Sequence, residues 1–203
     1  GTTASVEQDA GTVNTTSTIT DYAISDGILN AKAGSTVTTL TMDGGEFNAE
    51  TSSRISTLNL NAGTANFGEN VAAAGNNVNV ALTGGTLNLV NNNTNDVINF
   101  TSYDSAGTIK FDIDLANNRN DKFKGAIAGT TLTLDDLNIN IFSDLVGQTG
   151  QIKLTTDGGG VIQTAAKTLT SDTGSGYKYL FKASDTDAFI GRTKRRDRNR
   201  NPN

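Results

Sequence analysis

The chain has 203 residues and a formal net charge of −5, and it contains no cysteine, no histidine, no tryptophan and a single proline. The missing cysteine excludes disulfides and thiolate metal sites, and the missing histidine excludes most nucleophile–base arrangements. Hydrophobic residues make up only 35% of the chain, which is little for a rounded core of this length. Because threonine, valine and isoleucine are plentiful, the composition favours a thin, regular β-structure over disorder.

Glycines mark an internal repeat in the first three quarters of the chain. Most of them open the phrase Gly-x-φ-polar-φ, where φ is apolar, as in Gly45-Glu-Phe-Asn-Ala and Gly85-Thr-Leu-Asn-Leu. This alternation is the pattern of a β-strand with one buried face. The repeat glycines stand 16 to 22 residues apart, at Gly11, Gly27, Gly45, Gly63, Gly85, Gly107, Gly129 and Gly150.

A second alternating strand recurs within the repeats. Leu40 and Met42 lie 13 and 15 residues after Gly27, and the same pattern returns at Leu58 after Gly45. Where a repeat is longer, the extra residues fall between the strands, because loops tolerate insertions and packed strands do not. We therefore predict an all-β fold, a right-handed parallel β-helix (solenoid) of about seven to nine coils over residues 1–191 that loosens after residue 150.

The repeat assigns side chains to columns that run along the solenoid. Two columns are predicted to point inward, one of Leu29, Phe47, Ala65, Leu87 and Ile109, and one of Ala31, Ala49, Phe67, Leu89 and Phe111. An outer column of Asn30, Asn48, Asn66 and Asn88 is flanked by Thr64, Thr86, Thr108 and Thr130. We interpret the asparagines as an amide ladder between coils, with a surface for ligand binding or self-association as the alternative.

Basic residues gather at the end of the chain. Six of the 16 lysines and arginines lie within residues 192–203, which we predict to be a disordered basic tail. The remaining body is acidic and does not attract nucleic acid.

Few residues are suited to catalysis or metal binding. Asp112 and Asp114 lie two apart in Phe-Asp-Ile-Asp-Leu and share one face of a strand, where we expect them to face solvent as a weak candidate for a metal or catalytic pair. The Asn91–Asn95 segment is expected to be a loop, where glycans are one conceivable ligand. We assign no catalytic residue and no cofactor.

Several phrases resemble the C-terminal part of bacterial autotransporter passengers, the secreted pertactin-like parallel β-helices. They are Gly84-Gly-Thr-Leu-Asn-Leu89, Ala106–Leu115 followed by Asn-Asn-Arg-Asn-Asp-Lys122, and Gly176-Tyr-Lys-Tyr-Leu-Phe181. The chain departs from the family in lacking tryptophan and in having an arginine-rich end where a helical linker is expected.

The resemblance implies a non-catalytic stalk or adhesin of the bacterial cell surface, associated with virulence. It also implies an outer-membrane β-barrel encoded outside these 203 residues, and host-cell glycans, host proteins or further copies of the chain as partners. The alternatives on the same fold are a polysaccharide lyase or hydrolase and a glycan binder like a phage tail spike.

Overall fold

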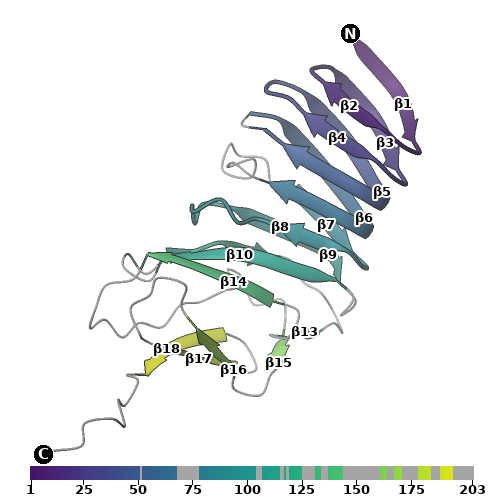
Figure 1. Cartoon of the computed structure of the whole chain (residues 1–203). Helices are drawn as coiled ribbons and strands as arrows, with labels where there is room; N and C mark the ends of the chain where they lie inside the picture. The colour runs from purple at the N-terminus through teal and green to yellow at the C-terminus, as the bar shows by residue number, and fades with distance from the viewer. Residues whose placement is uncertain are drawn as a thin grey trace, which may run out of the picture.

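The computed structural model is an all-β solenoid (Figure 1). The structure describes residues 1–50, 52–67, 78–103, 107–114, 117, 119–124, 131–133, 137–143, 161–163, 167–170, 178–183 and 188–193, and side chains as far as Phe123. No helix occurs within these ranges. In particular, this part of the chain has no long apolar helix that would cross a membrane.

One face of the solenoid stacks seven strands in parallel. They follow one another in the order β1 (Thr2–Gln8), β3 (Thr18–Ile24), β5 (Thr36–Ala49), β6 (Arg54–Phe67), β7 (Val78–Leu82), β9 (Val97–Tyr103) and β12 (Lys122–Lys124). Each strand pairs with its equivalent in the next coil, so that Leu40 lies opposite Leu58, and Leu58 lies opposite Val80. This register confirms the second strand of the predicted repeat.

A second face contains the strands of the glycine phrase. It runs through β2 (Thr12–Thr15), β4 (Ile28–Ala31), the ends of β5 and β6, β8 (Thr86–Asn88), β10 (Thr108–Asp114) and β14 (Leu137–Ser143). All of these pairs are parallel, and the predicted column from Leu29 to Ile109 is present residue for residue. The fold is therefore a parallel β-solenoid, with about five turns in its regular part.

The core lies between the two faces and includes the predicted inner columns. Phe47, Ala65 and Leu87 follow one another in one column and are each 0% exposed. Large and small residues alternate between the two inner columns. The ring of Phe67 packs edge-on against the ring of Phe47 in the neighbouring column, with ring centroids 5.8 Å apart. This exchange keeps the volume of each coil nearly constant, as close packing requires.

Glycine is required where each coil turns from one face to the other. Gly45 and Gly85 both have φ near +70°, a conformation that side chains with a Cβ rarely adopt. A Cβ at either residue would also lie 2.7 Å from a backbone carbonyl oxygen of the preceding coil, that of Gly27 or Gly63. The glycine spacing in the sequence therefore indicates where the backbones of successive coils come into close contact.

The first coil contains a buried polar residue in place of an apolar one. Gln8 occupies the column of Ile24 and Met42, yet it is a glutamine that is only 5% exposed. Its Nε2 donates to the carbonyls of Gly11 and Ile28 at 2.9 and 3.1 Å, and its Oε1 accepts from the Tyr22 hydroxyl at 2.7 Å. Because both ends of the amide are hydrogen-bonded, a buried glutamine at this otherwise apolar position costs little stability.

From β13 on, the described strands other than β14 lie outside the main sheet. Strands β13 (Thr131–Thr133) and β15 (Val161–Gln163) pair in parallel, whereas β16 (Lys167–Thr170), β17 (Lys178–Ala183) and β18 (Ala188–Thr193) form an antiparallel sheet. Strands β16–β18 thus run antiparallel, and the loosening of the repeat after residue 150 stays a prediction. The predicted basic tail overlaps β18 at Arg192 and Thr193, and residues 194–203 lie outside the described residues.

Candidate functional site

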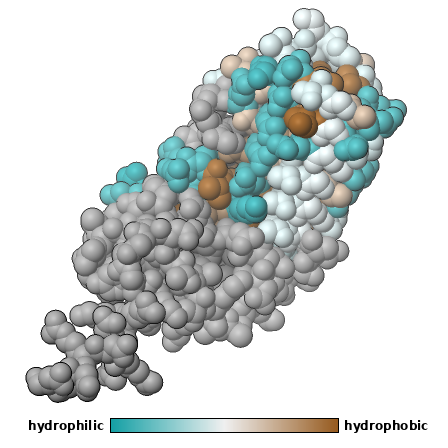
Figure 2. Space-filling view, in the orientation of Figure 1, coloured by the Kyte–Doolittle hydropathy of each residue, from teal (hydrophilic) through white to brown (hydrophobic). Residues whose placement is uncertain are grey.

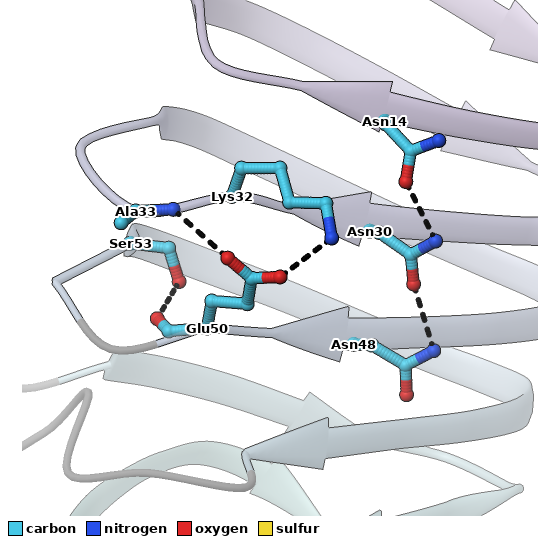
Figure 3. A network of polar contacts seen from close by, with 7 residues as sticks. All are labelled: Asn14, Asn30, Lys32, Ala33, Asn48, Glu50 and Ser53. Atoms are coloured by element: carbon cyan, nitrogen blue, oxygen red, sulfur yellow. Dashed lines mark hydrogen bonds and ion pairs between the residues drawn. The ribbon is translucent and has the colours of Figure 1, made fainter.

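The outer asparagine column forms a continuous chain of hydrogen bonds. Asn30 donates from Nδ2 to Oδ1 of Asn14 at 2.9 Å, and Asn48 donates in the same way to Asn30 at 3.0 Å (Figure 3). The ladder continues through Asn66 and Asn88 with two further bonds of 2.9 Å. Each amide therefore donates toward the preceding coil, and the four predicted residues are brought together with Asn14 as a fifth member.

Other outward side chains are also paired along the solenoid axis. Asn61 donates to Asp43 at 2.8 Å and accepts from the Thr83 hydroxyl at 2.6 Å, so three coils are linked. On the same face Asn99 donates to Asn79 in the preceding coil at 2.5 Å. Figure 2 shows hydrophilic side chains gathered along the described part of the solenoid.

An ion pair joins two coils at one corner. Lys32 Nζ lies 2.6 Å from Glu50 Oε1, and the Ser53 hydroxyl donates to the Glu50 carbonyl at 2.7 Å (Figure 3). The hydrogen bond from Lys32 lowers the pKa of Glu50. Both side chains of the pair are more than a third exposed, so water screens the attraction and it contributes little to stability.

The chemically unusual region is a buried group of acids near β10. Asp112 and Asp121 are 0% exposed and Asp96 is 1% exposed. Asp112 lies within β10, and Asp96 and Asp121 directly precede the paired strands β9 and β12. We call Asp96, Asp112 and Asp121 the carboxylate cluster.

The carboxylate cluster binds backbone N–H groups. Asp112 Oδ2 accepts from the N–H groups of Asn91 and Asn93, at 2.6 and 3.3 Å. Asp121 accepts from two others, with Oδ2 from Asp112 N at 2.8 Å and Oδ1 from Asp96 N at 3.3 Å. The cluster therefore fastens the Asn91–Asp96 loop and β10 to the strand that begins after Asp121.

Burial alters the acidity of two members of the cluster. Burial raises the pKa of Asp121 to about 8; the N–H of Asp112 opposes the shift, and the carboxylates of Asp96 and Asp112 add to it. Burial also raises the pKa of Asp96 to about 6; the Asn91 amide opposes this shift and the Asp112 carboxylate adds to it. In both cases the cost of removing a charge from water outweighs the hydrogen bonds that favour the charge.

The expectation that Asp112 and Asp114 both face solvent is wrong. Asp112 is fully buried and Asp114 is 7% exposed. The outward side of β10 is covered because β11 (Arg119–Asn120) folds back antiparallel onto its end, and because the Asn91–Asn93 segment binds Asp112. The alternating pattern of the sequence cannot show that other segments of the chain cover the outward side of a strand.

The two acids of the predicted pair also serve separate purposes. Asp114 accepts from the backbone and side-chain nitrogens of Asn117, at 3.1 and 2.6 Å, whereas Asp112 binds the Asn91–Asn93 segment. No group of three or more acidic side chains in the described part of the chain is arranged to hold a metal ion.

Sequence reasoning missed Asp96 and Asp121. One signal was present, because each stands two residues before an apolar residue of the strand that follows, Ile98 and Phe123. The register pairs those two strands residue by residue, which places the two aspartates at equivalent positions of neighbouring coils. A search for repeats of 25 residues would have related them.

Comparisons with protein-family models, curated proteins and solved structures give no significant match for this chain.

Proposed function

We propose that this chain is a non-catalytic extracellular stalk, part of an autotransporter-like surface protein. The observation that carries the proposal is the axial pairing of the outward polar side chains, seen in the Asn14–Asn88 ladder and in the Asp43–Asn61–Thr83 series. Side chains that are bonded to the next coil stiffen a rod. They are also less available to bind a ligand.

The carboxylate cluster supports the same proposal. An acid–base catalyst must reach the substrate within hydrogen-bond distance. Asp112 and Asp121 are fully buried, which is typical of residues with a structural role. Their oxygens accept hydrogen bonds from backbone N–H groups at 2.6 to 3.3 Å. Raised carboxyl pKa values are common at active sites, but they also arise wherever acids are buried together.

The bacterial cell surface is the proposed location, on the strength of the phrases that resemble autotransporter passengers. A parallel solenoid without cysteine suits that setting, because a stacked continuous core replaces the disulfides of small secreted domains. Host-cell glycans, host proteins or further copies of the chain are the proposed partners. Nucleic acid is not a proposed partner, because the chain has a net charge of −5.

The test of the proposal combines a cleavage assay with a retention assay. The purified chain is incubated with acidic polysaccharides to detect cleavage, and it is applied to host cells and glycan surfaces to detect retention. Asp112→Asn removes the charge at the centre of the cluster, and Asp43→Asn, at an exposed aspartate, is the matched control.

We expect no cleavage by any of the three proteins. Retention that all three share would identify an adhesive stalk, and no retention would identify a purely structural one. Polysaccharide cleavage that Asp112→Asn abolishes and Asp43→Asn retains would overturn the proposal in favour of an enzyme.

A further inference from the structure

The Asn91–Asp96 loop is attached to the solenoid differently from the turns of the earlier coils. In the equivalent turns of those coils, the first backbone N–H donates to a backbone carbonyl of the preceding coil, as from Lys32 to Thr15 at 2.9 Å and from Glu50 to Ala31 at 3.0 Å. In the loop, the N–H groups of Asn91 and Asp96 donate to carboxylates instead, and that of Asn93 is shared between the Asn91 amide oxygen at 2.8 Å and Asp112 at 3.3 Å. A carbonyl has no ionisable proton, whereas a carboxyl group does.

The charges around Asp96 and Asp121 leave these two acids without a cationic partner among the described residues. Among the side chains that the structure describes, the charged ones on the strands next to them are the exposed Lys110 and Arg119, the half-buried Lys122, and the acids Asp112 and Asp114. Neither Asp96 nor Asp121 forms an ion pair with any of these three cations. Buried charges without partners are costly, so the cluster favours the bound proton.

One oxygen in the cluster is suited to hold that proton. Asp96 Oδ2 accepts from Asn91 Nδ2 at 2.8 Å, whereas Asp96 Oδ1 is buried and has no hydrogen-bond partner. A buried acceptor without a partner is destabilising. Protonation removes the charge of this carboxyl group and so reduces that cost.

We propose that the carboxylate cluster is a proton-dependent clasp, which holds the Asn91–Asp96 loop against β10 when protonated and loosens it as protons are lost. The clasp adds a regulated segment to the proposed stalk, and it does not depend on what the stalk binds. An increase in pH would loosen this loop while the asparagine ladder, which does not titrate, stays intact.

The acidities of the two groups set the direction and the range of the effect. Asp96 and Asp121 have pKa values of about 6 and about 8 in the folded chain, above the ordinary value of 3.8. The folded state therefore keeps protons that an opened state releases. The stabilisation is complete below pH 4 and is lost as the pH rises through 6 and 8.

The test is amide hydrogen exchange of the full chain between pH 5 and 9, corrected for the intrinsic exchange rate. The reporters are the N–H groups of Asn91, Asn93, Asp96 and Asp112, and the controls are those of Lys32 and Glu50. We expect the protection of the reporters to fall at least about tenfold across this range, and the protection of the controls to stay constant. Reporter protection that is constant or that rises with pH would overturn the proposal.

Two further measurements separate the clasp from a general loss of structure. Asp121→Asn should remove most of the pH dependence above pH 6, while Asp43→Asn should leave it unchanged. Carbon NMR of the wild-type carboxyl groups reads the titration without any substitution. An Asp121 carboxyl that titrates near pH 4 would contradict the proposal even if the Asp121→Asn variant did not fold.

Discussion

Leu87→Ala is the perturbation whose cost is best defined by the structure. Leu87 is 0% exposed and is stacked between Ala65 and Ile109 of the neighbouring coils. Truncating a buried leucine costs about 2–5 kcal/mol, depending on how far the surroundings collapse into the cavity. Collapse is restricted here because Ala65 is too small to fill the space. We therefore expect a loss in the upper half of the range, about 3–5 kcal/mol.

The adjacent Asn88→Ala variant is the matched control for Leu87→Ala. Asn88 points outward and contributes one ladder bond to Asn66, so its loss should cost about 0.5–1.5 kcal/mol. Urea unfolding followed by circular dichroism gives both values. Because solenoids can unfold in segments, amide exchange of the two neighbouring coils should accompany it. Equal losses for the two variants would refute the inward and outward assignment of this strand.

Three other predictions test separate features of the fold. Gly85→Ala should destabilise the chain by at least about 1 kcal/mol more than Gly34→Ala, as measured by urea unfolding, because both residues have positive φ but only Gly85 is crowded by the preceding coil. Lys32→Ala should change stability by less than about 0.5 kcal/mol in the same assay, since its ion pair with Glu50 is exposed. The free energy of unfolding should decrease from pH 5 to pH 8, and Asp121→Asn should flatten this dependence in urea titrations at each pH.

The sequence predicted the regular coils because the same contacts recur at a regular spacing of 16 to 22 residues. Alternation identified Leu29 and Phe47 as inward and Asn30 and Asn48 as outward, and the glycine spacing set the register between them. These assignments depend on one strand and its equivalent in the next coil. The coils that contain β4, β5, β6 and β8 repeat this arrangement, so the pattern is reinforced each time.

The carboxylate cluster could not be predicted in the same way. Alternation places Asp112 on the outward side of β10, which is correct, but the antiparallel β11 and the Asn91–Asn93 segment cover that side. The covering contacts join residues up to 25 positions apart, and they occur once, where the repeat changes. The same limit applies to the antiparallel β16–β18 sheet, for which no repeating phrase exists.

The most direct test of the stalk account is a double-mutant cycle across the ladder bond from Asn48 to Asn30. The free energies of unfolding of Asn30→Ala, Asn48→Ala and the double variant give the coupling between the two side chains. The account predicts a favourable coupling of about 0.5–1.5 kcal/mol, the contribution of one hydrogen bond between coils. A coupling of zero would contradict it, because the outer asparagines would then not stabilise the stacked coils.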